Sequence, residues 1–444
     1  MNDSHNNQPQ SATSSFDRRR FLQGSALAGA AISAPMVAPS SVLGREGAVP
    51  PSDQILMGGI GIGNRGDYDL RQFLPNQDVR FVAICDARQS RREHVKKLVD
   101  NRYDNNDCKT YRRIREFLEE RTDIDMVLIA TGDRWHALAS IMAMRAGKDI
   151  YTEKPSCMTI EEGQAVVDTA RRFGRVYQTG TQRLSEANFT FANELVRRGI
   201  LGDVHTVRAH IAPWDAAEMR YDWLPEQSLP PESEVDWDEW LGPCPWRPYN
   251  EQYVRGGWRG FYDFHTSCIG EWGAHTFAQC QFAIGAADTS PVQYHYVPNP
   301  TGDGMITRFA NGIDMVLQLE GWEGSCGVKY EGTEGWVSIA DGYEKPDVSN
   351  PAWLNDFDTI VSEYQERTQR PMNHWRNLLD CVKNRRQPVA NPEVMHRSMT
   401  TVHAANICMW LKRDMQFDPI REEFINDDEA NRLRSRAQRE PWVL

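Results

Sequence analysis

The sequence predicts an α/β domain with a parallel sheet, followed by an α+β domain with a large, mostly antiparallel open sheet. Between residues 54 and 179, apolar strands alternate with amphipathic helices, and that alternation is typical of βαβ units. Beyond about residue 182 the strands are short and separated by glycine turns, which is typical of antiparallel pairing. We therefore expect domains at 52–180 and 181–444, for which 444 residues are sufficient.

Each element of the first domain has its own signal. Apolar runs predict strands at residues 55–60, 79–85, 126–130, 149–152 and 176–179. Amphipathic spacing predicts helices at residues 111–120, 137–146 and 159–173. The last helix begins with the capping box Thr159-x-x-Glu162 and ends at Gly174, which can close a helix in the left-handed conformation.

The second domain shows weaker but readable patterns. A helix is expected at 185–198, stopped by Gly199, and strands are expected at 204–211, 315–319 and 336–340. Residues 213–263 are rich in proline, tryptophan and tyrosine, and the chain from 372 onward is mostly helical and charged. Because we find no internal repeat, one broad antiparallel sheet is the expected framework.

Composition limits the classes of partner. The chain has 50 lysines and arginines against 62 aspartates and glutamates, so the net charge is 50 − 62 = −12, which disfavours nucleic acid. No apolar run is long enough to span a bilayer, so we expect no stable membrane insertion. The nine cysteines include no Cys-x-x-Cys pair, which disfavours a disulfide framework and a thiolate zinc site.

Residues 1–45 are expected to form an export signal and linker outside both domains. The pair Arg18-Arg19 precedes two large apolar residues and a small, mildly apolar stretch at 24–34, as in a twin-arginine signal. We therefore expect the twin-arginine export machinery as a partner and a periplasmic location. A disordered basic N-terminus is the alternative. The twin-arginine route moves folded proteins, so a bound cofactor can travel with the chain.

A Gly-x-Gly-x-x-Gly fingerprint follows the first predicted strand and opens a helix, as in Rossmann dinucleotide-binding domains. Gly61 permits the tight turn, Gly63 lets the backbone approach a pyrophosphate, and Gly66 lets helix and strand pack closely. Asn64 and Arg65 complete this loop, where free N–H groups at the helix N-terminus would hold the pyrophosphate. A purely structural glycine turn is the alternative.

An acid at the end of the second strand predicts the nucleotide. Asp86 comes 20 residues after Gly66, where a carboxylate accepts hydrogen bonds from the adenosine ribose and repels a 2′-phosphate. We therefore expect NAD, with NADP less favoured. Arg88 is close enough in sequence to soften that preference.

Several later motifs carry a family resemblance. They are the segments 129–136 (IATGDRWH), 153–155 (EKP), 178–183 (QTGTQR), 271–275 (EWGAH) and 374–377 (HWRN). Together they resemble the signature of the glucose–fructose oxidoreductase/inositol dehydrogenase (Gfo/Idh/MocA) family, and the resemblance covers residues 52–444. Glu-Lys-Pro after a strand, in phase with the glycine fingerprint, is the most specific element.

The resemblance implies a nicotinamide ring between the two domains, with Lys154 and His275 catalytic and the acid Glu271 assisting. Chemistry agrees, because removing a hydride from a carbinol carbon needs a base such as His275. Lys154 would stabilise the developing alkoxide. Glu271 lies four residues before His275, on the same helical face, where it could orient the imidazole. Further cofactor contacts are expected from Thr131, Trp135, His136, Glu153 and Gln182.

Two departures from the family and several alternatives stay open. The family usually has Asp where this chain has Glu271, and Gly132 replaces a frequent proline. Lys154 could instead be a solvated lysine, His275 a core histidine, and Glu271 a surface acid. A Glu-x-x-x-His pair can also bind a metal, but no third ligand stands at a suitable spacing, so no metal is expected.

Aromatic residues predict the substrate class. Seven of the fourteen tryptophans fall between residues 213 and 272, and rings of this kind pack against the C–H faces of sugars. The expected pocket walls are Arg183, Trp258, Tyr262, His265 and Trp272. The alternative is that these rings cover one face of the sheet, and we expect about half of them to do only that.

Three functions follow from these observations. The first is an oxidoreductase of a sugar, glycoside or cyclitol, with hydride transfer between a carbinol carbon and a tightly bound nicotinamide cofactor, recycled by a second sugar or exchanged. The second is a redox-neutral, NAD-dependent glycosidase that works by oxidation, elimination and re-reduction. The third is a non-catalytic sugar-binding protein. The resemblance also implies a homo-oligomer, as broad sheets of this family often pair.

Overall fold

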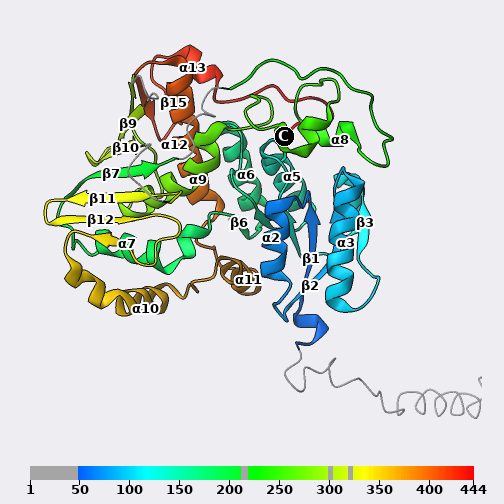
Figure 1. The fold of residues 1–444 in the computed structure, drawn as a ribbon, viewed down its shortest axis with the longest axis horizontal. Coiled ribbons are helices and arrows are strands. Elements are labelled where there is room, and N and C mark those ends of the chain that lie inside the picture. Colours follow the sequence, from blue (N-terminus) through cyan, green and yellow to red (C-terminus); the bar gives the residue numbers. More distant parts are fainter. Residues whose placement is uncertain (1–48, 212–218, 299–303, 319–323) are drawn as a thin grey trace, which may run out of the picture. The chain divides into compact units, whose positions relative to one another are not determined.

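The computed structural model describes residues 49–211, 219–298, 304–318 and 324–444. The chain from Gln54 to Leu444 forms one compact unit that contains both predicted sheets (Figure 1). The expected export signal at residues 1–45 lies outside the described residues, and so does Trp214.

The first sheet has six strands, all parallel, in the order β3-β2-β1-β4-β5-β6. Its strands are β1 (Ile55–Ile60), β2 (Val79–Cys85), β3 (Lys109–Tyr111), β4 (Met126–Ile129), β5 (Asp149–Thr152) and β6 (Tyr177–Thr179). Every residue of β4 and β5 is buried, as expected for strands covered by helices on both faces. The predicted parallel α/β domain is confirmed.

Helices follow these strands on both faces of the sheet. They are α2 (Asn64–Phe73), α3 (Gln89–Tyr103), α4 (Ile114–Glu120), α5 (Asp133–Arg145) and α6 (Ile160–Phe173). The predicted cap of α6 is present, because the backbone N–H of Glu162 donates to the Thr159 hydroxyl at 3.2 Å. Gly174 ends that helix with a φ of +60°.

Two predicted helices differ from the structure. Residues 109–111 form the edge strand β3, so the helix expected at 111–120 begins only at Ile114. Helix α5 begins at Asp133, four residues before the predicted start. Residues 133–136 include three charged or polar side chains, yet all four residues are buried, because later parts of the chain cover this first turn. The Asp133 carboxylate, for example, accepts from the Thr266 backbone at 3.0 Å.

The second sheet has nine strands in the order β13-β12-β11-β7-β10-β9-β8-β14-β15. They are β7 (Val204–His210), β8 (Gln293–Val297), β9 (Gly304–Arg308), β10 (Asp314–Gln318), β11 (Val328–Gly332), β12 (Gly335–Ile339), β13 (Asp347–Val348), β14 (Met415–Asp418) and β15 (Glu423–Phe424). Only the β7–β10 pair is parallel among the described pairs. The predicted, mostly antiparallel sheet is confirmed.

Long helices pack against this second sheet and against one another. They are α7 (Ala187–Arg197), α9 (Ser267–Ala283) and α12 (Pro392–Leu411), and the shorter helices of this part are α8 (Trp237–Leu241), α10 (Phe357–Thr368), α11 (His374–Asn384) and α13 (Asp428–Arg432). Helix α11 packs instead on the first domain, where the Trp375 indole donates to Asp69 at 3.3 Å.

The segment 219–266, between β7 and α9, covers the carboxyl ends of the parallel strands (Figure 1). The N–H of Gln89 donates to the Glu234 carbonyl at 2.9 Å, and the N–H of Asp236 donates to the Ala87 carbonyl at 3.0 Å. The C-terminal tail fastens this cover, since Arg436 pairs with Glu162 of α6 at 2.6 Å. The segment 219–266, which we call the roof, thus covers one edge of the first sheet.

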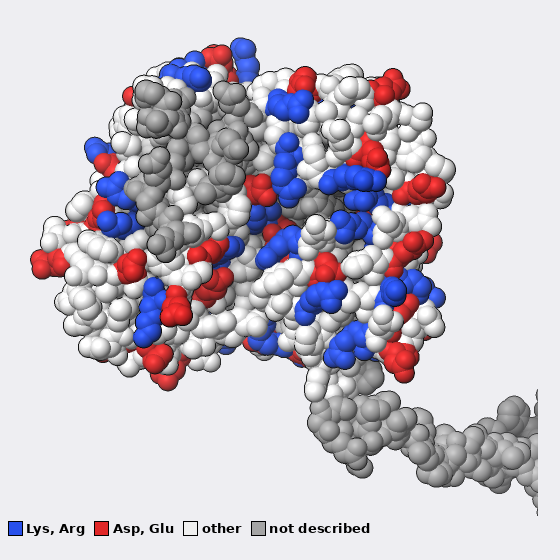
Figure 2. Space-filling view, viewed as in Figure 1, with Lys and Arg blue, Asp and Glu red and all other residues white. Residues whose placement is uncertain are grey.

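The surface carries charges of both signs, and the cysteines lie in the packed interior. Figure 2 shows basic and acidic side chains interspersed on the drawn face. All nine cysteines are buried as free thiols. Within the described ranges there is no cluster of three potential metal ligands, and no helix there has the length and apolarity of a membrane span.

Candidate active site

The glycine fingerprint places the end of β1 against the end of β4. Gly61 has a φ of +67°, and a Cβ there would lie 2.9 Å from the Cα of Thr131. A Cβ on Gly66 would lie 2.7 Å from that of Ala130. Gly63 differs, because its missing side chain would point into open space. The loop therefore needs glycine at positions 61 and 66 for close packing, whereas Gly63 leaves the backbone open to a ligand.

A cavity of about 520 Å³ opens at this edge, where α2 and α5 begin; we call it the larger cavity. The predicted cofactor-binding residues that line it are Gly61, Gly63, Asn64, Arg65, Asp86, Thr131 and Trp135. Its opposite wall comes from the segment 219–266 and includes Glu239, Trp240, Val254, Trp258 and Arg259. Neither α2 nor α5 has a side-chain cap, so their first N–H groups remain available for an anion.

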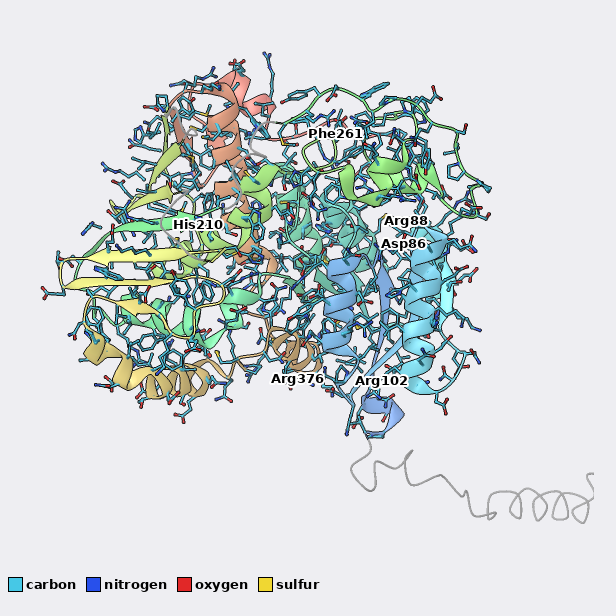
Figure 3. The ribbon with its side chains drawn as sticks, in the orientation of Figure 1. Asp86, Arg88, Arg102, His210, Phe261 and Arg376 are labelled. Carbon is cyan, nitrogen blue, oxygen red and sulfur yellow. The ribbon has the colours of Figure 1, made fainter. Side chains whose placement is uncertain are left out.

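Asp86 stands at the end of β2, next to the larger cavity and close to α8 (Figure 3). Arg88 lies beside it, whereas Arg102 lies at the far end of α3. Burial raises the pKa of Asp86 to about 6. The backbone N–H of Arg88 donates to the carboxylate at 2.8 Å and acts in the opposite direction, to lower this pKa. The Arg88 guanidinium itself donates to the Val254 carbonyl at 2.9 Å, so it ties the roof to this edge.

A second, smaller cavity of about 260 Å³ adjoins the first. It is lined by the predicted residues Lys154, His275, Glu271, Arg183, Trp272, Trp258, His136, Glu153, Arg65 and Thr131. Arg65, Thr131 and Trp258 line both cavities, which therefore share a wall. The structure thus brings the predicted catalytic residues together beside the predicted nucleotide site.

Lys154 follows β5 and is held without a carboxylate partner among the described residues. Its ammonium donates to the backbone carbonyl of Glu271 at 2.8 Å and lies 5.4 Å from the centre of the Trp272 ring. A carbonyl does not neutralise the ammonium charge, so Lys154 remains a positive charge directed at this cavity.

His275 is buried in α9 and is neutral. Arg183 Nη1 lies 3.0 Å from His275 Nε2, and a guanidinium can only donate, so Nε2 accepts and the ring proton sits on Nδ1. Burial, together with the charges of Arg183 and Lys154, lowers the pKa of His275 well below its ordinary value. A neutral imidazole with an acceptor nitrogen in the cavity is the form that can take a proton.

Asp341, which nothing in the sequence singled out, holds Arg183 in place. Both of its carboxylate oxygens accept from the Arg183 guanidinium, at 2.9 and 2.5 Å, and Ser325 donates to the same carboxylate at 2.8 Å. Burial acts to lower the pKa of Arg183, but the hydrogen bonds and the charge of Asp341 raise it above its ordinary value. Asp341 lies 158 residues from Arg183 in the chain, so no local pattern could have revealed the contact.

Sequence comparison agrees with these two parts of the chain. Residues 55–181 match the profile of the Gfo/Idh/MocA oxidoreductase family's NAD-binding Rossmann fold, and residues 187–444 match its C-terminal alpha/beta domain. The chain belongs to the Gfo/Idh/MocA oxidoreductase family.

Curated relatives cover only part of the chain. A glycosyl hydrolase family 109 protein of Shewanella baltica is 34% identical over 220 residues, which are 44% of this chain and 46% of that protein. An alpha-N-acetylgalactosaminidase of Shewanella oneidensis is 30% identical over 230 residues, 46% of this chain and 48% of that protein. The match thus spans less than half the length of these relatives.

Solved structures of sugar and cyclitol dehydrogenases share the fold. Myo-inositol 2-dehydrogenase of Lactobacillus plantarum superposes with a TM-score of 0.56 at 15% identity, covering 82% of this chain and 100% of that one. The WlbA dehydrogenase of Chromobacterium violaceum, in complex with NADH and UDP-GlcNAcA, gives 0.59 at 15% identity, covering 82% and 96%. At this identity the likeness concerns the fold alone.

The residues of the larger cavity fit the dinucleotide that this family's Rossmann domain binds. Gly63 leaves space where any other residue would place a Cβ, and uncapped helix N-termini border the cavity. Asp86, a carboxylate of the kind that accepts from a ribose in such domains, lines the same cavity.

The structure corrects the role expected of Glu271 in this family site. Its carboxylate does not contact His275 but accepts from His265 Nε2 at 3.2 Å and from Arg259 at 3.3 Å. Burial acts to raise the pKa of Glu271, but the His265 hydrogen bond and the nearby charges of Lys154 and Arg259 lower it to about 2. One helical turn separates Glu271 from His275, but Arg183, not Glu271, contacts the imidazole.

Glu153 and Gln182 belong to a buried polar network below the cavity. The Glu153 carboxylate accepts from Arg65 at 3.1 Å and from the Gln182 amide at 3.0 Å. The same Gln182 amide donates to Tyr151 at 3.2 Å, and Gln182 lines neither cavity. Glu153 therefore fixes Arg65 at the junction of the two cavities, and Gln182 supports Glu153.

His136 and Trp135 anchor the first turn of α5. The nitrogen His136 Nδ1 lies 2.7 Å from the Pro155 carbonyl and donates to it, which ties this turn to the residue after Lys154. The Trp135 indole donates to the Glu239 carbonyl at 2.9 Å in the roof. Both side chains are buried, so they position the cavity walls more than they expose binding groups.

The predicted substrate-binding aromatics separate into two groups. Trp258 and Trp272 line the smaller cavity, and His265 reaches it through Glu271. Tyr262 lies elsewhere, with its ring centre 5.2 Å from Tyr221 and 5.6 Å from Trp410, and lines neither cavity.

Most other rings of the roof form its own small core. They are Trp237, Trp240, Tyr253, Phe261 and Phe264. The described tryptophans of 213–272 therefore divide: Trp237 and Trp240 belong to this core, Trp258 and Trp272 line the smaller cavity, and Trp223 and Trp246 are exposed.

Proposed function

We propose that the protein is an NAD-dependent glycosidase that cleaves a glycoside by oxidation, elimination, hydration and re-reduction, with no net redox change. The observation that carries the proposal is the smaller cavity, where the neutral imidazole of His275 and the ammonium of Lys154 adjoin the nucleotide site. The names of the sequence relatives in glycosyl hydrolase family 109 favour this reaction over simple dehydrogenation.

Each group has a defined task in this scheme. Bound NAD, held by residues of the larger cavity such as Gly63 and Asp86, would supply the hydride acceptor and donor for a carbinol carbon. Lys154 stabilises the negative charge that develops on the oxygen of that carbon. His275 Nε2 takes the proton of the hydroxyl that is oxidised once the substrate displaces Arg183 Nη1 from that nitrogen; the lowered pKa of His275 keeps the imidazole neutral, as a base must be. Water then replaces the leaving group, so the net reaction is hydrolysis.

The test is aglycone release without added nucleotide. Purified full-length protein is incubated with a panel of chromogenic glycosides that begins with an α-N-acetylgalactosaminide. We expect many turnovers per chain with no accumulation of reduced nicotinamide, and deuterium in the sugar product when the solvent is D₂O. The matched control for replacing His275 by alanine is His205→Ala, which alters an exposed histidine of β7 and leaves the site intact.

A dehydrogenase of a free sugar or cyclitol is the second candidate, and the fold of the solved sugar and cyclitol dehydrogenases favours it. That reaction would accumulate reduced nicotinamide in proportion to added NAD and release no aglycone. Sugar binding with neither activity would instead support a non-catalytic sugar-binding protein.

We also propose that NAD, rather than NADP, stays bound through export by the twin-arginine route. The support is Asp86 in the larger cavity and the roof that closes over it through Arg88 and Val254. Replacing Arg18 and Arg19 together by lysine should leave the protein in the cytoplasm, whereas the exported wild type should carry about one NAD per chain after dialysis. Unchanged export of the double variant would contradict the assigned route.

A further inference from the structure

Arg134, in the first turn of α5, is a buried cation without an anionic partner. Its side chain is 4% exposed, and two of its N–H groups donate to one acceptor, the Trp240 carbonyl, at 2.9 and 2.8 Å. The guanidinium carbon lies 3.7 Å from the centre of the Trp240 ring. Among the described residues no carboxylate forms an ion pair with it, and Nη1 has no hydrogen-bond partner.

Such a charge is costly to bury. Burial lowers the pKa of Arg134 to about 10, because neither the carbonyl nor the ring offsets the lost hydration of a cation. Arg65, Arg112 and Arg259 at the same cavity have carboxylate partners; Arg112, for instance, pairs with Glu232 and Asp236 at 3.2 and 3.3 Å. Arg134 lacks such a partner and is also buried, whereas Arg65 and Arg259 are exposed.

The place of the missing anion follows from the wall around Arg134. Arg134 and Gly132 both line the larger cavity, which Gly63 and Asn64 of the glycine fingerprint also line. A Cβ on Gly132 would lie 2.4 Å from Arg134 Nη1, so glycine at position 132 leaves room for the guanidinium to lie beside the backbone at this wall. The uncapped N-termini of α2 and α5 border the same space, and their N–H groups also favour an anion.

We propose that Arg134 is a binding residue for the diphosphate of the dinucleotide, with Gly132 as the residue that leaves room for the guanidinium at the cavity wall. The inference rests on the proposed cofactor binding and goes beyond it, because the glycine fingerprint alone needs no such cation. The diphosphate replaces the missing counterion and joins the Trp240-anchored guanidinium to the N-termini of α2 and α5. Arg134 then contributes to cofactor retention through charge and not through base or ribose recognition.

The experiment compares ADP with adenosine, which differ by the diphosphate alone. Full-length protein is freed of nucleotide on charcoal, and both ligands are titrated by calorimetry into wild type, Arg134→Met, Arg134→Lys, Gly132→Ala and Arg171→Met. We expect Arg134→Met to weaken ADP about 10- to 100-fold and to leave adenosine nearly unchanged, as for loss of a charge-assisted hydrogen bond. Arg134→Lys should fall in between, and Arg171→Met, at an exposed arginine away from the larger cavity, should keep the wild-type ratio.

Gly132→Ala keeps the charge of Arg134 but takes the space of its guanidinium, so the displaced charge should also reduce the preference for ADP. If Arg134→Met does not fold, Gly132→Ala and Arg134→Lys decide the matter by the same ratio. An unchanged ratio in the folded variants would overturn the proposal. So would a sugar phosphate that loses affinity in these variants while ADP does not, because the anion would then belong to the substrate. Glycosidase activity is not the readout, so failure of the proposed reaction would leave this result interpretable.

Discussion

The two adjoining cavities are built in opposite ways. One wall of the larger cavity is formed by residues that follow strands β1, β2 and β4, such as Gly61, Asp86 and Thr131, and the glycines there act through backbone geometry. The smaller one collects Lys154, Arg183 and His275 from distant parts of the chain, and its chemistry depends on charges between side chains. A local motif can thus specify where a dinucleotide is held, whereas the protonation state beside it is set by long-range contacts.

The largest effect is expected at Lys154. Lys154→Ala should lower turnover by about 10²–10⁴-fold, because it removes the only charge assigned to the developing oxyanion. Retained NAD should stay near the wild-type amount, since the larger cavity is untouched. Lys97→Ala, on the exposed side of α3, is the matched control for loss of a lysine. Near-normal turnover in Lys154→Ala would remove the smaller cavity from the mechanism.

His275→Ala should lower turnover by about 10²-fold or more and abolish the acid limb of the pH–rate profile. In wild type this limb should lie below pH 6.5, because burial and the charges of Arg183 and Lys154 lower the pKa of His275, which must be neutral to accept a proton. Activity is therefore lost only as the pH falls through that lowered value. The pH dependence of kcat/KM measures it, and an unchanged acid limb in His275→Ala would indicate another base.

Asp86→Ala should lose about tenfold in NAD affinity, with a smaller loss for NADP, because the carboxylate accepts from the ribose and repels a 2′-phosphate. Since the pKa of Asp86 is raised to about 6, wild-type NAD affinity should also decline as the pH falls through that value. Calorimetry between pH 5 and 8 checks both expectations, with Asp107→Ala as the exposed control. Equal affinity for both nucleotides in wild type would contradict the assignment.

The smallest effect is expected at Asp341. Asp341→Asn frees the Arg183 guanidinium from its carboxylate, so the Arg183 charge is held less firmly at His275 Nε2. The pKa of His275 should then rise toward its ordinary value and move the acid limb upward by about one pH unit or less. NAD retention should not change. A shift of the acid limb would show that Asp341 acts by positioning Arg183. A merely structural role would instead lower kcat at every pH without moving the limb.

Local patterns predicted most of the first domain because its signals are short in range. Strand periodicity, the capping box at Thr159 and the glycine fingerprint each involve residues within a few positions of one another. The early start of α5 was missed because its polar first turn, from Asp133 to His136, is buried by a segment about a hundred residues later. Burial of polar residues by distant chain has no local sequence signature.

Family motifs named Lys154, His275 and Glu271, and the structure brings all three to one cavity. Their partners were not predictable, since Asp341 and Arg259 carry no motif and reach the site only through the second domain. The expected Glu271–His275 pair illustrates the limit. Helical spacing placed both residues one turn apart but could not show that His265 and Arg259 compete for the carboxylate.

The sequence by itself determined the two sheets, the glycine turn and the identity of the groups with reactive side chains, because these depend on residue type and on spacing along the chain. The tertiary structure alone decided the protonation state of His275, the lack of a counterion for Arg134 and the placement of Tyr262 away from both cavities. Each depends on which charges and rings meet between residues about ninety or more apart in the chain, and electrostatic and packing energies are set by distance in space.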